Sequence, residues 1–198
     1  HFERFFSRGA YLSVYLNTIQ VSVIVSIICL LMGYPVAYFI VRQTPAWRPT
    51  LLFLILIPLW MSFLVRTYAW MVVLGREGII NSVLIDLGII DKPLKLLFTT
   101  GTVYVAMIQL LLPIMIISCY SAMTEIDQSL MRAARVFGAK ASRAFWEVFL
   151  PLSLGGALTG TIVVFILSMG FFITPALLGG RKDMMMANFI ESQLEQAA

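Results

Sequence analysis

Residues 11–41 read YLSVYLNTIQVSVIVSIICLLMGYPVAYFIV and contain no Asp, Glu, Lys or Arg. Residues 96–124 and 148–180 are equally free of charge, and residues 51–75 contain only Arg66. A bilayer core about 30 Å thick needs about 20 apolar helical residues, and each stretch is long enough. The alternation expected of a membrane-spanning strand is absent. The sequence therefore predicts an all-α, polytopic transmembrane bundle with four spanning helices.

The composition supports lipid as the solvent of this chain. Of its 198 residues, 60% are hydrophobic and 12% are charged, about half the charged fraction of a soluble domain. The net charge of +4 comes from bases in short loops, which favours a role in membrane orientation over nucleic-acid binding. Cys29 and Cys119 fall inside predicted spans without metal-ligand spacing, so no metal or cofactor is expected. The length fits a single domain over residues 1–198.

The spanning helices are predicted at residues 11–41, 50–74, 100–121 and 152–178. Bends are expected at Gly33 and Pro35 in the first helix and at Pro58 in the second. In the fourth, small residues at 155, 156 and 160 permit close helix packing. Between the second and third helices, the breakers and apolar spacing of residues 75–99 predict a short helix at the membrane interface.

The loops set the orientation. The link at residues 42–49 carries Arg42 and Arg48, and the loop at residues 123–150 carries several more bases, so both are expected in the cytoplasm. Residues 75–99 and 179–198 would then face outward, although residues 75–99 also carry three bases.

The loop between the third and fourth helices contains SLMRAARVFGAKASRAFWEVFLPLS at residues 129–153. Helix formers and small residues precede Gly138, which permits a sharp turn. A second amphipathic turn places Phe145, Val148 and Phe149 on one face, and Pro151 opens the next helix. The pattern predicts a helix–glycine–helix elbow anchored by its aromatic face, although a connecting loop without a partner has the same physical pattern.

The spacing of this loop resembles the coupling loop of ATP-binding-cassette (ABC) importer permeases, with the pattern E-A-A-x3-G-x9-I-x-L-P. Arg132 stands where the pattern has Glu, so an ion pair made there in relatives is absent or reversed. The resemblance assigns ATPase coupling to seven residues: Arg132, Ala133, Ala134, Gly138, Ala139, Leu150 and Pro151. Residues 57–84 and 169–190, the run LNT at 16–18 and the run GYPVA at 33–37 look like the spermidine/putrescine branch of this family.

The resemblance implies a permease fold with four to five core helices plus a cytoplasmic coupling helix. It also implies a bacterial inner-membrane location and a further helix beyond each end of the sequence. The implied partners are cytoplasmic ATPase subunits, a second permease subunit and an extracytoplasmic solute-binding protein. This chain would hydrolyse no ATP and would contain no catalytic residue. A polyamine is the implied cargo, with opines, amino-acid-like and other small solutes left open.

Six residues are candidates for the translocation path or its gate: Arg66, Trp70, Phe171, Phe172, Thr174 and Pro175. Pro175 is expected either to unwind the fourth helix as part of a gate or to end it at the outer interface. Arg66 either lines the path or is structural. The rival functions are a secondary transporter or channel and an intramembrane enzyme. Neither is favoured, because the spans contain no acid and the sole histidine is His1.

Overall fold

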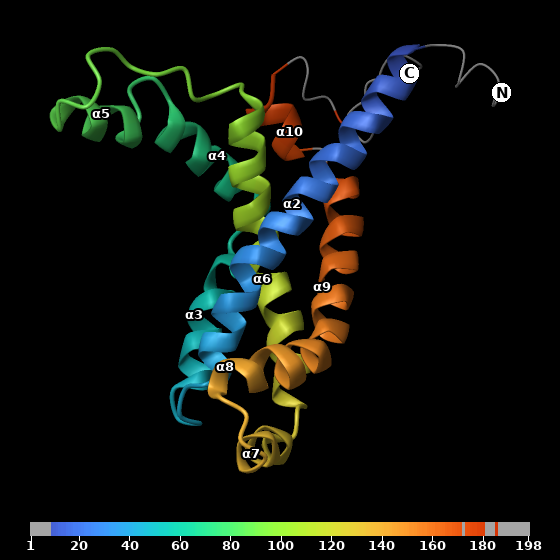
Figure 1. The fold of residues 1–198 in the computed structure, drawn as a ribbon. Helices are drawn as coiled ribbons and strands as arrows, with labels where there is room; N and C mark the ends of the chain where they lie inside the picture. The colour runs from blue at the N-terminus through green and yellow to red at the C-terminus, as the bar shows by residue number, and fades with distance from the viewer. Residues whose placement is uncertain (1–8, 172, 181–184, 186–198) are drawn as a thin grey trace. The chain divides into compact units, whose positions relative to one another are not determined.

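The computed structural model describes residues 9–171, 173–180 and 185, and their regular structure is helical (Figure 1). The prediction of an all-α fold is confirmed. In chain order the elements are α2 (Gly9–Val41), α3 (Arg48–Trp60), α4 (Phe63–Leu74), α5 (Ile79–Asp86), α6 (Thr100–Thr124), α7 (Gln128–Val136), α8 (Ala141–Ala144), the π-helical η1 (Phe145–Phe149), α9 (Leu150–Gly170) and α10 (Ile173–Leu178).

Four stretches of the described chain are long and apolar enough to cross a membrane: Leu12–Val41, Phe63–Asp86, Thr100–Thr124 and Ala141–Gly170. Large apolar side chains such as Leu31, Leu158 and Ile162 point outward, which is the arrangement expected where lipid covers the helices. The stretch Phe63–Asp86 differs from the predicted span at residues 50–74. It consists of α4, a turn and the predicted short helix, which is α5.

The predicted second helix is interrupted, and the interruption does not fall at Pro58. Pro58 lies inside α3, which continues to Trp60. The chain leaves the helix at Met61 and Ser62, and the carbonyl of Ser62 accepts the first backbone hydrogen bond of α4, from Arg66, at 3.1 Å. Ser62 takes the N-cap position with a non-helical ψ of 135°, although its hydroxyl makes no capping hydrogen bond within the described part of the chain.

The predicted fourth helix is also divided. α9 ends at Gly170, and α10 begins at Ile173 with Pro175 in its first turn. The break precedes the proline because a helical residue 171 would direct its carbonyl at the ring of Pro175, which has no N–H to donate. Backbone N–H groups in the first turn of a helix have no acceptor within that helix, so α10 tolerates Pro175 there without losing a hydrogen bond.

The chain divides into two compact units. One unit contains Ser26–Pro58 and Leu111–Val164, and here we call it the elbow unit because it includes α7, α8 and η1. Its helices pack closely where small residues meet: a side chain added at Gly156 would overlap Ala122, and one at Gly160 would lie 2.8 Å from Ser118 Cβ. Gly155, also expected to permit packing, faces open space instead.

The second unit contains Leu59–Leu110 with the described parts of His1–Val25 and Phe165–Ala198, and we call it the α4–α10 unit. In it α4 contacts both α5 and α10, and the rings of Phe63 and Phe171 lie 5.0 Å apart. The buried Asn81 holds the loop after α5: its Nδ2 donates to the carbonyls of Gly75 and Leu94, and its Oδ1 accepts from the Leu94 N–H at 2.9 Å.

Candidate functional site

The first limb of the elbow is the short helix α7, which is tied to the end of α6 by residues 125–127 (Figure 1). Asp127 caps it: one carboxylate oxygen accepts the backbone N–H of Ser129 at 2.8 Å, and the other accepts its hydroxyl at 2.6 Å. These hydrogen bonds, that of the Ser129 hydroxyl first, hold the pKa of the Asp127 carboxyl below its usual value. The cap is therefore ionised at neutral pH, as suits a helix N-terminus.

Gly138 forms the turn of the elbow. Its φ is +86°, in the left-handed region that other residues avoid. The N–H of Ala139 reaches back to the carbonyl of Ala134 at 3.0 Å, which is the six-to-one bond of a Schellman motif with Gly138 at its C′ position. The predicted turn at Gly138 is therefore present, and it exists because the helix ends in a conformation that glycine adopts without strain.

The outer surface of the elbow carries two large apolar side chains. Val136 is 84% exposed and Phe137 is 90% exposed, directly before the glycine turn. Arg132 and Ala133 are also exposed, whereas Ala134 and Ala139 are half-buried. Val136 and Phe137 are not among the residues that the sequence predicted for this surface. The available signal was a pair of large apolar residues immediately before the glycine, at the end of a helix that carries two arginines.

The second limb of the elbow, formed by α8 and η1, is anchored by aromatic contacts. The ring of Tyr38 in α2 meets the rings of Phe145 at 5.0 Å and Phe149 at 5.1 Å, both edge to face. Phe149 is buried, and Val148 is half-buried. The predicted aromatic face therefore anchors the elbow, and the part that the sequence did not reveal is its partner, Tyr38.

The π-helical turn η1 is the end of this limb and continues directly into the membrane helix α9. The N–H of Leu150 bonds the carbonyl of Phe145, five residues back, and Pro151 follows with no N–H to donate. Beyond the proline, Ser153 hydrogen-bonds the hydroxyl of Tyr34 at 2.6 Å. Leu150 and Pro151 thus lie where the elbow continues into α9, without a loop between them.

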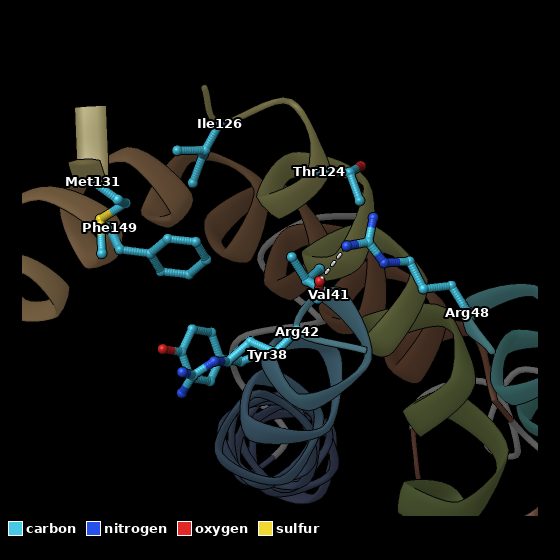
Figure 2. Close-up of a pocket in the computed structure, with 8 residues that line it drawn as sticks. All are labelled: Tyr38, Val41, Arg42, Arg48, Thr124, Ile126, Met131 and Phe149. Atoms are coloured by element: carbon cyan, nitrogen blue, oxygen red, sulfur yellow. Dashed lines mark hydrogen bonds between the residues drawn. The ribbon is translucent and has the colours of Figure 1, made fainter. Parts of the chain in front are cut away.

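A cavity of about 460 Å³ lies beside the elbow, between the ends of α2 and α6 and the two limbs. Figure 2 shows its lining. The guanidinium of Arg48 donates to the carbonyl of Val41 at 2.7 Å and to that of Gln43 at 3.0 Å, which satisfies the end of α2. Arg42 stacks on Tyr38, with its Cζ 5.4 Å from the ring centroid.

The candidate path residues that the structure describes belong to the α4–α10 unit, whereas the candidate coupling residues belong to the elbow unit. Phe171 is brought to α4 through Phe63. Trp70 is half-buried, and Thr174 is fully buried with a hydroxyl that has no hydrogen-bond partner among the described residues. Phe172 lies outside the described residues.

Arg66 also lacks partners. Two nitrogens of its guanidinium, Nε and Nη1, are buried and make no hydrogen bond. These nitrogens therefore bond no helix-end carbonyl of the described residues, which is the structural role the sequence left open. A cation without a partner in a membrane-spanning stretch is unfavourable, so a partner is expected beyond the described residues.

Taken together, these features define a polytopic helical membrane protein with an anchored elbow between α6 and α9. Among the described residues, no three His, Cys, Asp or Glu side chains gather to hold a metal ion. The chain belongs to the family of binding-protein-dependent transport system inner membrane components, whose family model matches residues 9–197.

Curated relatives support this assignment. The chain is 42% identical over 183 residues to the spermidine/putrescine transport system permease protein PotB of Haemophilus influenzae, covering 92% of this chain and 64% of the relative. It is 34% identical to PotB of Escherichia coli K12, covering 92% and 66%. A molybdenum transport system permease, ModB of Mycobacterium bovis, is 31% identical over 74% of this chain and 54% of its own length. The chain thus spans about two thirds of the length of the two PotB proteins.

Solved structures agree on the fold. A chain of a bacterial alginate ABC transporter, crystallised with an alginate-bound periplasmic protein, superposes with a TM-score of 0.78. The match covers 100% of this chain and 72% of that chain at 17% identity. The predicted permease fold is therefore confirmed.

Proposed function

We propose that this chain is the membrane-spanning permease subunit of an ABC importer and that its elbow docks a cytoplasmic ATPase subunit. The observation that carries the proposal is the geometry of the elbow: a capped helix, a left-handed glycine turn and a second limb fixed to α2 by Tyr38. Such an elbow is fixed to the membrane helices while its outer surface stays available.

The docking surface is formed by the end of α7. Val136 and Phe137 expose apolar area that suits insertion into a pocket of a partner, and Arg132 adds a positive charge beside them. Because Arg132 stands where the family pattern has Glu, the ATPase surface that meets it is expected to carry an acidic residue. Large exposed aromatic residues at the centre of an interface commonly carry much of its binding energy.

Movement of the ATPases would be transmitted through the second limb. η1 continues into α9 without a loop, and its rings hold α2 through Tyr38. A displacement of the elbow therefore acts on two membrane helices of the elbow unit together. In the complete transporter, two ATPases, a second permease subunit and an extracytoplasmic solute-binding protein complete the assembly, and ATP hydrolysis takes place outside this chain.

A polyamine is the proposed cargo, because the relatives with the highest identities reported above are spermidine/putrescine permeases. The buried, partnerless hydroxyl of Thr174 and side-chain oxygen of Gln109 are acceptors of the kind that bind ammonium groups. Arg66 repels such a cargo, so in this account it pairs with an acceptor or carboxylate of the second permease subunit.

Cysteine cross-linking tests the docking. A complex of the full-length chain with its ATPase, carrying Phe137→Cys and single cysteines on the ATPase surface that faces the membrane, should form a disulfide on mild oxidation. Arg76→Cys, also exposed but in the loop before α5, is the matched control and should form none. Cross-linking through position 76 but not 137 would contradict the docking proposal.

A further inference from the structure

The cavity beside the elbow takes no part in the transport proposal. Its lining residues all come from the elbow unit: Tyr38, Val41, Arg42, Arg48, Thr124, Ile126, Met131 and Phe149. Its volume of about 460 Å³ lies within the range of small-molecule sites, about 300–1,000 Å³. Two of its lining side chains are cations and none is an acid.

The two arginines retain hydrogen-bond donors for a ligand. Arg48 uses its Nε and Nη2 on backbone carbonyls, and its Nη1 makes no hydrogen bond to any described residue. Arg42 rests only on the face of Tyr38, and within the described part of the chain it forms no ion pair. The nearest acids in sequence do not compete: Asp127 is occupied by Ser129, and the exposed Glu125 does not line the cavity. The cavity is therefore suited to an anion with several oxygen acceptors.

The position of the cavity identifies the source of that anion. Two candidate membrane spans end at its rim, at Val41 and Thr124. Two tryptophans of the same unit lie close in sequence to the lining residues Arg48 and Phe149. Trp47 is 63% exposed and Trp146 is 65% exposed. Exposed tryptophans at the ends of spanning helices mark the level of lipid headgroups. Basic pockets between helices at this level bind the headgroups of anionic lipids.

We propose that this cavity binds the phosphate group of an anionic membrane lipid, held by Arg42 with the hydroxyl of Tyr38, while Arg48 adds positive charge on the other side of the cavity (Figure 2). Met131 of α7 and Phe149 of η1 line the same cavity, so a bound headgroup contacts both limbs and stabilises the angle between them. Either leaflet of the membrane supplies such lipids. The proposed lipid binding does not depend on the proposal that the chain is an importer permease.

Native mass spectrometry of the full-length chain in its transporter complex tests the site. The complex is reconstituted in nanodiscs with equal parts of phosphatidylglycerol and phosphatidylcholine, released into detergent, and the retained lipids are identified by mass. The wild-type complex should retain phosphatidylglycerol in preference to phosphatidylcholine. Arg42→Gln should lower this retention about fivefold, because one guanidinium is lost from the pocket. Arg42→Lys should restore much of it.

Arg76→Gln is the matched control, since it removes one exposed charge from a loop that does not line the cavity. Its retention should equal that of the wild type. Added inorganic phosphate in large excess should displace little lipid. Phosphate binding that depends on Arg42 and displaces the lipid would overturn the membrane source. Equal retention of phosphatidylglycerol by wild type, Arg42→Gln and Arg76→Gln would overturn the site altogether.

Discussion

Position 138 combines a strained backbone region with open space around it. A side chain there would meet no atom within 4 Å, so the φ of +86° alone decides which residues are tolerated. A β-branched residue in this region costs about 1–2 kcal/mol, whereas asparagine adopts it readily. Replacing Gly138 by valine or by asparagine therefore separates the effect of the backbone conformation from the effect of added side-chain bulk.

We expect Gly138→Val to open the turn and to reduce transport about tenfold while the complex still hydrolyses ATP and remains in the membrane. Gly138→Asn should keep transport close to the wild-type rate. The measurement is the ratio of solute imported to ATP hydrolysed in proteoliposomes. Wild-type coupling in the valine variant would show that the elbow does not transmit motion.

Adjacent glycines in α9 provide a test of helix packing. A Cβ at Gly156 would overlap the side chain of Ala122 in α6, whereas one at Gly155 would meet nothing within 4 Å. Gly156→Ala should therefore destabilise the elbow unit by about 1–3 kcal/mol through overpacking, and Gly155→Ala should not. Thermal unfolding of the purified chain in detergent compares the two. Equal losses would mean that the packing of α6 against α9 is not as close as described.

The Asp127 cap predicts how α7 depends on pH. The folded-state pKa lies below the usual 3.8, so the stabilisation is present above that value and is lost only as pH falls through the lower, folded-state value. Hydrogen–deuterium exchange of residues 128–136 should thus show the same intrinsic protection from about pH 5 to about pH 8. Asp127→Ala should speed exchange in the first turn, and Asp127→Asn, which retains an acceptor, should not. Protection that rises steadily from about pH 5 to about pH 8 would mean that a group other than Asp127, titrating in this range, caps the helix.

Among the elements, spans were predicted from sequence more securely than interruptions. The absence of charge predicts where helices cross lipid, because each charge in a span is costly. The positions of breaks depend on which carbonyl a proline faces and on which residue takes the N-cap. Each proline therefore indicates that a break lies within a few residues of it. The breaks themselves are at Ser62, after Pro58, and at Phe171, before Pro175.

The break before α10 predicts a movable element at the candidate gate. Thr174 is fully buried in the described state, and its hydroxyl lacks a partner. If α10 moves when substrate is released, Thr174→Cys should react with a water-soluble thiol reagent several times faster in one of the nucleotide-free and ATP-trapped states. Ala69→Cys, on the exposed face of α4, should react equally in both. Equal rates at position 174 would make α10 a fixed end of the bundle.

For the whole molecule, the sequence predicted the elbow through the spacing of Ala134, Gly138 and Pro151. That spacing is local, and the turn it specifies depends on one backbone conformation. The cavity and the anchoring of the elbow were not predictable in the same way. They depend on Tyr38 and Arg42 lying against residues about 100 positions away in sequence, which no local pattern reveals.

The central claim is that ATP hydrolysis in partner subunits drives solute through this chain. Uptake of radiolabelled spermidine or putrescine by proteoliposomes, with the full transporter, ATP in the lumen and the binding protein outside, tests it most directly. The account predicts uptake that requires both ATP and the binding protein and that continues when a protonophore removes the proton gradient. Uptake that proceeds without ATP and stops on addition of the protonophore would contradict it.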